Sequence, residues 1–399
     1  MVQQVPASGQ RDCGRAALPA ALAVLGPLVL AAAAPARAAD PRPPQVAVGF
    51  TASPAPIMQG GVTKLFYELT LINVSPLRYT IASIAARGGD ATASFAGVAL
   101  ERIVAPFGKR PQKPDPKNLV IEGGHGAIVY LELDLGHAKA PAAITHELRI
   151  ADAKGEIHTV SLAPEPVLDA APVVVAPPLR GDWIAGDAVN NGMDAAHRRA
   201  AMVEGGQLWL AQRYAIDWVQ GRRVHGRMTT FDGPEHRNES YFCYGQAIYS
   251  VADGTVVDAS DGLADNVPHS GNYAEPIDFN NAAGNHVVVE IGPARYVLYA
   301  HMKPGSVRVK AGQSVRTGDV LGNVGDTGSS TEPHLHMHID DHPSFLGGNS
   351  VPYVFASGMA SGPTAANVSS SGTIAFGPIG PQKPFTDDYP DDAALVSFQ

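Results

Sequence analysis

The sequence predicts an all-β protein with more than one domain. Short apolar runs in which apolar and polar residues alternate recur along the chain, as in "QVAVGF", "KLFYELTLINVS" and "GAIVYLELDL", and turn residues separate them. Glycine and proline are abundant, with 42 and 33 copies, which favours turns over long helices. At 399 residues the chain is too long for one ordinary core, so two or three domains are expected.

Residues 1–38 are expected to be an export signal. Arg11 and Arg15 precede an apolar, alanine-rich stretch, and "ARA" at residues 36–38 fits the small-x-small rule for cleavage. An N-terminal membrane anchor is the alternative, although prolines and a glycine interrupt the stretch. We therefore expect an exported protein, periplasmic or extracellular, with no stable membrane span after cleavage.

Charge and cysteine content restrict the possible partners and cross-links. The formal net charge is −9, and no basic run or stripe is present, so nucleic acid is not expected as a partner. Cys13 lies within the predicted signal, which leaves Cys243 as the single cysteine of the mature chain. An intramolecular disulfide is therefore excluded.

Residues 39–165 are expected to form an accessory β-sandwich, which serves as a spacer or a binding module. Their short strand-like runs include the hairpin "HELRIADAKGEIHTVSL". The proline-rich residues 166–182 then predict a linker. Residues 183–356 again read as strands with glycine turns, and residues 357–399 predict a flexible acidic tail.

The segment "TEPHLHMHID" carries three histidines at alternating positions. In a strand, His334, His336 and His338 lie on one face, and the apolar residues between them lie on the other. Same-face neighbours are roughly 6.6 Å apart along a strand, so two imidazoles can reach a shared ion. The alternative is a half-exposed strand with a polar outer face. A hydrolytic zinc site also needs about three protein ligands and an open position for water.

Two upstream segments supply further candidates for such a site. An apolar strand in "RYVLYAHM" ends on His301, and "AQRYAIDWV" places Asp217 in an otherwise apolar strand. A buried aspartate requires a cation or hydrogen-bond donors.

From about residue 183 to residue 355 the chain resembles the lysostaphin-like (LytM-type) zinc endopeptidases, which cut peptidoglycan peptides. The resemblance rests on "RYAID", "GQAIYSVADGTVV", "YVLYAHM" and "GSVRVKAGQSVRTGDVLGNVGDTGSSTEPHLHMHI", which occur in the order of that family. It implies a lysostaphin-like antiparallel β-sheet or half-barrel, a zinc cofactor and peptidoglycan peptides as substrate. It further implies that Asp217 and His336 are zinc ligands, that His334 is the general base and that His301 is a second catalytic histidine.

The sequence departs from the family pattern at Arg213, which stands four residues before Asp217, where the family has its first ligand histidine. Arginine stays protonated and has no lone pair for zinc. Two outcomes are open: another histidine completes the site, or Arg213 pairs with Asp217 in place of the metal. The candidate histidines are His197, His225, His236 and His338.

Two functions therefore follow from the sequence. The first is an exported zinc metalloendopeptidase that acts on the peptides of the cell wall. The second is a catalytically degenerate relative that binds cell-wall peptide or regulates a wall hydrolase. A carrier domain with a modified lysine is a remote third possibility, because no lysine stands at a suitable hairpin tip.

Overall fold

The computed structural model describes residues 43–224, 227–364, 366–368, 374–377 and 379–399. Residues from Pro43 to Gln399 form one compact unit. The predicted export signal, residues 1–38, lies outside the described residues. Within the described part of the chain, no helix combines the length and the apolar character needed to cross a membrane.

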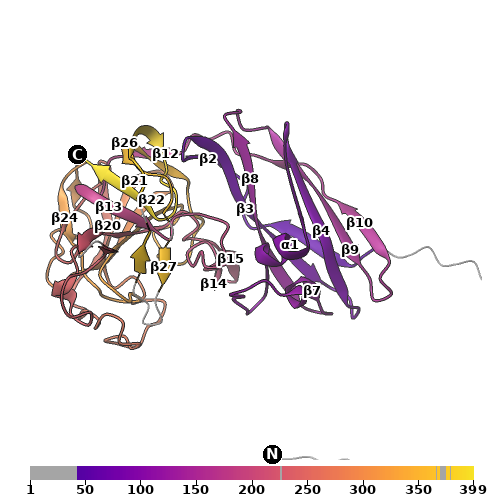
Figure 1. Cartoon of the computed structure of the whole chain (residues 1–399), viewed down its shortest axis with the longest axis horizontal. Coiled ribbons are helices and arrows are strands. Elements are labelled where there is room, and N and C mark those ends of the chain that lie inside the picture. The colour runs from indigo at the N-terminus through magenta and orange to yellow at the C-terminus, as the bar shows by residue number, and fades with distance from the viewer. Residues whose placement is uncertain (1–42, 225–226, 365, 369–373, 378) are drawn as a thin grey trace, which may run out of the picture. The chain divides into compact units, whose positions relative to one another are not determined.

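The fold is nearly all β, as predicted, and its N-terminal part consists of two sheets around one core. One sheet has the order β1-β3-β8-β6, with β2 on β3, and the other has the order β10-β9-β4-β5, with β7 paired to β4 and β11 paired to β9. Figure 1 shows β3 and β8 of the first sheet and β4, β9 and β10 of the second. Leu69 of β3, Val129 of β8 and Leu148 of β9 belong to the apolar core that the two sheets share. The elements are β1 (Val46–Phe50), β2 (Pro56–Gln59), β3 (Val62–Asn73), β4 (Tyr79–Gly88), β5 (Ala91–Ala96), α1 (Gly97–Ile103), β6 (Val104–Pro106), η1 (Pro116–Leu119), β7 (Val120–Ile121), β8 (Gly126–Gly136), β9 (Ala143–Ala151), β10 (Ile157–Ser161) and β11 (Glu165–Pro166).

A larger sheet follows and carries the candidate site. Its order is β12-β26-β30-β13-β16-β25-β22-β21-β20-β23, with β29 paired to β26. Its strands are β12 (Val173–Val175), β13 (Gly181–Gly186), β16 (Ile216–Val219), β20 (Gly254–Ser260), β21 (Asn285–Gly292), β22 (Arg295–Met302), β23 (Ser314–Val315), β25 (Leu335–Asp340), β26 (Tyr353–Ala360), β29 (Lys383–Asp388) and β30 (Ala394–Phe398). The smaller elements around it are β14 (Met202–Glu204), β15 (Gln207–Trp209), β17 (Arg222–Val224), β18 (Arg227–Thr229), η2 (Asn238–Ser240), β19 (Ala247–Tyr249), β24 (Val320–Asn323), β27 (Ala366–Val368) and β28 (Ile374–Phe376).

The histidine strand, β25, lies between β16 and β22 and is antiparallel to both. Leu335, Met337 and Ile339 enter the apolar core, which is the alternation that the sequence predicts. The histidine face is also covered, since every residue of β25 is buried. A half-exposed strand with a polar outer face is therefore wrong as a description of this segment.

The C-terminal residues and the proline-rich segment contribute more structure than the sequence indicates. Strand β30 pairs with β13 and β26, and Phe398 contacts Trp218 and Phe355 with ring centroids 5.3 Å from each. Strand β12 pairs in parallel with β26. These parts differ from the expected loose tail and open linker because their short apolar runs join the large sheet, β12 at its edge and β30 between β26 and β13.

Candidate metal centre and catalytic cavity

The site lies where three neighbouring strands bring polar side chains to one cavity. Asp217 of β16 stands opposite His336 of β25 in the antiparallel register, and Ala300 of β22, one residue before His301, stands opposite His336 on the other side. His334 directly precedes β25. The cavity has a volume of about 510 Å³, and the side chains of Asp217, His301, His334 and His336 all line it.

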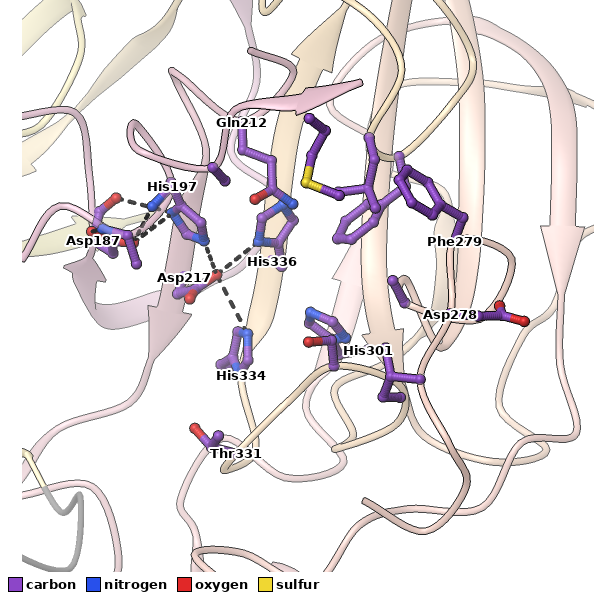
Figure 2. A pocket seen from close by; sticks show the side chains of 18 of the residues that line it. Asp187, His197, Gln212, Asp217, Asp278, Phe279, His301, Thr331, His334 and His336 are labelled. Atoms are coloured by element: carbon purple, nitrogen blue, oxygen red, sulfur yellow. Dashed lines mark hydrogen bonds and ion pairs between the residues drawn. The ribbon is translucent and has the colours of Figure 1, made fainter. Parts of the chain in front are cut away.

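Three donor atoms meet at the Asp217 carboxylate and form the candidate metal centre. His336 Nδ1 lies 2.9 Å and His197 Nε2 lies 3.3 Å from Asp217 Oδ1 (Figure 2). The three donors lie within 4.8 Å of one another. Two imidazole nitrogens and one carboxylate oxygen form a donor set that zinc prefers, so these residues fit the cofactor that the resemblance implies.

The ring of His197 is oriented by Asp187 (Figure 2). Its Nδ1 lies 3.0 Å from the Asp187 carbonyl oxygen, and its backbone N–H donates to Asp187 Oδ2 over 2.8 Å. Donation from Nδ1–H to the carbonyl oxygen turns Nε2 toward Asp217, so the lone pair of Nε2 faces the site once its proton leaves. The tautomer that this contact selects is therefore the one that a metal ligand requires.

The ring of His336 is oriented by His338. His336 Nε2 lies 2.9 Å from His338 Nδ1, while His336 Nδ1 faces Asp217. A lone pair on His336 Nδ1 requires the proton on Nε2, which then donates to His338 Nδ1. His338 in turn carries its proton on Nε2, which lies 3.9 Å from the buried Asp340 Oδ2. His338 thus supports His336 from behind and does not face Asp217.

His334 and His301 share one arrangement, in which Nδ1 bonds to a backbone carbonyl oxygen. His334 Nδ1 lies 2.8 Å from the Glu332 carbonyl oxygen, and His301 Nδ1 lies 2.8 Å from that of Thr327. His334 Nε2 lies 3.4 Å from Asp217 Oδ1. The backbone of His301 has a φ of 61°, which is strained for a residue other than glycine. Such strain is typical of residues that a functional site holds in place.

Asp217 is the negative charge around which the histidines titrate. Burial disfavours its ionised form, but His197 and His334 outweigh burial and hold the pKa of Asp217 well below its usual value. Burial likewise disfavours the charged form of His197, yet Asp217 and Asp187 raise its pKa to about 10. Burial also opposes protonation of His334, and Asp217 raises its pKa to about 9. Without a metal ion, the protonated rings of His197 and His334 therefore supply the positive charge that the Asp217 carboxylate favours.

The other two histidines of the site are neutral. Burial lowers the pKa of His336 to about 4. Burial, together with His334 and His336, holds the pKa of His301 well below its usual value. Both rings therefore keep a free lone pair at neutral pH.

The four histidines proposed to replace the family ligand have different positions. His197 joins Asp217 and His336, while His338 contacts His336 from the far side. His236 bonds through Nδ1 to the Pro268 carbonyl oxygen at 2.8 Å, and it does not line the cavity. His225 lies outside the described residues.

Arg213 does not fill the metal position. Its ion pair is with Glu68 of β3, and Nη2 lies 2.6 Å from Glu68 Oε2. Within the described ranges, the ion-pair partners of Asp217 are His197, His334 and His336. The expected alternative, in which Arg213 pairs with Asp217, is therefore wrong.

Sequence reasoning did not identify Asp187 and Glu68 as neighbours of the site. Asp187 lies ten positions before His197 in an irregular segment, and Glu68 lies within an otherwise ordinary strand of the N-terminal sheets. The one available signal was the charged residue in the apolar run "LFYELTL", because a buried carboxylate requires a partner.

Comparison with known proteins supports the family resemblance for part of the chain. Residues 236–347 match Peptidase family M23. This M23 segment includes His301, His334 and His336, whereas His197 and Asp217 precede it. The match supports the resemblance to lysostaphin-like enzymes for residues 236–347, and the replacement of the first ligand by Arg213 stays a prediction.

Several curated proteins are similar to part of the chain. "Peptidoglycan DD-endopeptidase ShyA" of Vibrio cholerae is 30% identical over 135 residues, which cover 32% of this chain and 26% of that protein. "DD-carboxypeptidase/endopeptidase Mpg" of Neisseria meningitidis is 38% identical over 89 residues, which cover 22% of this chain and 18% of that protein. The matches thus span about a quarter or less of these relatives.

Among solved structures, the catalytic domain of lysostaphin from Staphylococcus simulans aligns at 21% identity. The alignment covers 31% of this chain and 84% of that one, with a TM-score of 0.20. The fold assignment therefore rests on the strand order described above.

The donor set predicts stoichiometric zinc binding. We expect the purified protein to hold about one zinc ion per chain and the His197→Ala and Asp217→Ala variants to lose it, because each removes one of three donors. The control is His236→Ala, whose ring bonds elsewhere. Metal analysis after dialysis measures the occupancy, and full zinc retention by His197→Ala would contradict the assignment of this residue.

Zinc binding is expected to release protons at neutral pH. His197 has its pKa raised to about 10 and is protonated at pH 7, whereas His336, with its pKa lowered to about 4, is already neutral. Binding then displaces the proton of His197 and, because the cation offsets the charge of Asp217, also favours loss of the proton of His334, whose pKa is raised to about 9. About one to two protons are therefore released per zinc ion, and affinity rises at least roughly tenfold per pH unit between pH 6 and pH 9 before it levels off above the pKa values. Titration calorimetry in two buffers of different ionisation enthalpy measures the release, and identical heats at pH 7 would show that no proton leaves.

Proposed function

We propose that residues 183–356 form a zinc metalloendopeptidase domain that hydrolyses peptide bonds of peptidoglycan. The observation that carries the proposal is the cluster of His197, Asp217 and His336 in the same cavity as His334 and His301. The M23 match supports the reaction class, and the names of the relatives, both of which denote endopeptidases, support the substrate class.

The atoms that would hold the metal are His197 Nε2, Asp217 Oδ1 and His336 Nδ1. Three protein donors are the number found in catalytic zinc sites, whereas structural sites are closed by four. When bound, zinc supplies Lewis-acid polarisation of the scissile carbonyl and acidification of a water molecule. Proton acceptance and orientation of the attacking water are assigned to His334 and His301.

His334 is proposed as the general base. Its Nδ1–H donates to the Glu332 carbonyl oxygen, which fixes the tautomer and leaves Nε2 to accept a proton from the attacking water. In the metal-free protein, Asp217 raises the pKa of His334 to about 9, so Nε2 already carries a proton at neutral pH and cannot accept another. A cation at Asp217 offsets this negative charge, so the pKa of His334 falls and its Nε2 becomes free.

His301 is proposed as the second catalytic histidine. Its Nδ1–H donates to the Thr327 carbonyl oxygen, and the lowered pKa of His301 keeps the ring neutral. Nε2 can then accept a second hydrogen bond from the attacking water and orient it. The ring centroids of His301 and His334 lie 4.8 Å apart, so both rings can form a hydrogen bond with one water molecule.

The cavity has features that suit an extended peptide. Phe279, Phe345 and Leu346 give it an apolar wall, and Arg110 adds a positive charge that suits a carboxylate. Because peptidoglycan lies outside the cytoplasm, the proposal includes export to the periplasm or the cell exterior, with residues 1–38 as the signal. The N-terminal sheets, residues 39–165, are proposed as an accessory domain.

The second candidate is a catalytically degenerate relative that binds cell-wall peptide or regulates a wall hydrolase. Arg213 at the expected ligand position favours it. His197 favours the enzyme, because its Nε2 supplies a third donor beside Asp217. The two candidates differ in whether peptide bonds are cut.

Hydrolysis of purified cell-wall sacculi distinguishes the candidates. We expect the zinc-loaded protein to release peptide fragments and the His334→Gln variant to do so at least about a hundredfold more slowly, because it loses the base but none of the metal donors. His286→Gln, on β21 and paired with Asp258, is the matched control. A zinc-loaded protein that binds sacculi without releasing fragments would establish the degenerate relative.

A further inference from the structure

A buried carboxylate of the N-terminal sheets bonds to arginines from two segments that supply metal donors. Glu68 of β3 is fully buried, and it accepts hydrogen bonds from two arginines of the peptidase part. Burial alone would raise the pKa of Glu68, but Arg213 and Arg198 outweigh burial and lower it. Glu68 is therefore ionised, and both arginines offset its buried charge.

Arg198 joins this carboxylate to the residue that supplies the third metal donor. It directly follows His197, is 1% exposed, and donates from Nε to Glu68 Oε1 over 3.2 Å. Its Nη2 donates to the backbone carbonyl oxygens of Tyr67 on β3, at 3.2 Å, and Leu131 on β8, at 2.6 Å. The segment that carries His197 is thus attached to two strands of the N-terminal sheets.

Arg213 joins the same carboxylate to the turn that precedes Asp217. Its Nε lies 3.0 Å and its Nη2 lies 2.6 Å from Glu68 Oε2, which is a charge-assisted pair with two donors. Two segments that supply metal donors therefore converge on one side chain. Arg213, which departs from the family pattern, and Arg198, which follows the candidate ligand His197, are thus bound by the same carboxylate.

We propose that Glu68 is a positioning residue of the metal centre. Through Arg198 it fixes the segment that presents His197 to Asp217, and the N-terminal sheets are thereby part of the metal site and more than a spacer or wall-binding module. This inference rests on the proposed function, since it takes His197 as a ligand. Because Glu68 does not contact the metal donors, it acts only through the arginines.

The test compares zinc affinity in Glu68→Gln and in a matched control. Glu132→Gln removes a carboxylate of β8, in the same sheet, whose partner is the partly exposed Lys64. In the full chain, we expect Glu68→Gln to bind zinc at least about tenfold more weakly than the parent in competition with a chelating dye. The control should bind as the parent does.

The zinc-dependent rise in melting temperature separates positioning from simple stabilisation. A purely structural role of Glu68 would lower the melting temperature of the metal-free variant and leave zinc affinity unchanged, which would overturn the inference. If Glu68 positions the metal centre, the rise in melting temperature on zinc addition is smaller in Glu68→Gln than in the parent, because this rise depends on zinc affinity.

A second variant keeps the test decisive if Glu68→Gln does not fold. Arg198→Lys retains a positive charge for Glu68 but loses the bonds to the carbonyls of β3 and β8, and it should also weaken zinc binding. If the parent itself binds no zinc, the proposed function fails along with this inference. If the parent binds zinc and both variants bind it equally well, the inference alone fails.

Discussion

The half-buried Asp217 carboxylate is the constraint on which the site depends. A carboxylate inside a protein requires opposite charge or hydrogen-bond donors, and Asp217 is surrounded by the rings of His197, His334 and His336. The register of β16 against β25 fixes its position opposite His336. Each histidine is fixed in turn by a contact of its other ring nitrogen, so the geometry around Asp217 is built before a metal arrives.

Those contacts at the other ring nitrogen also divide the histidines by role. Asp187 orients His197 so that its Nε2 faces Asp217, and His338 orients His336 so that its Nδ1 faces Asp217. Backbone carbonyl oxygens hold Nδ1 of His334 and of His301, so the second nitrogen of each ring is Nε2, which in His334 faces Asp217. One carboxylate can therefore gather two candidate ligands and a candidate base, because the tautomer of each ring is chosen outside the cluster.

The sequence predicts the local part of this arrangement well. A period of two on residues 334–338 places alternate side chains on one face, and the apolar surroundings of Asp217 mark it as a buried charge. The third donor is harder to predict, since His197 reaches the site from an irregular segment that has no period. Its neighbour Arg198 bonds to Glu68, 130 positions away in the chain, and no local pattern reports such a contact. The strands near the C-terminus were missed because glycine, serine and proline dominate the composition around two short apolar runs.

The predicted replacement of a ligand by Arg213 need not abolish a metal site, because another segment reaches the same carboxylate. Here Arg213 turns to Glu68, and His197 lies beside Asp217. The direct measurement of this account is an anomalous-diffraction map, recorded at the zinc edge, from crystals of the zinc-loaded protein. We predict one peak about 2.0–2.2 Å from His197 Nε2, Asp217 Oδ1 and His336 Nδ1. A peak without His197 among its ligands, or no peak beside Asp217, would contradict the account.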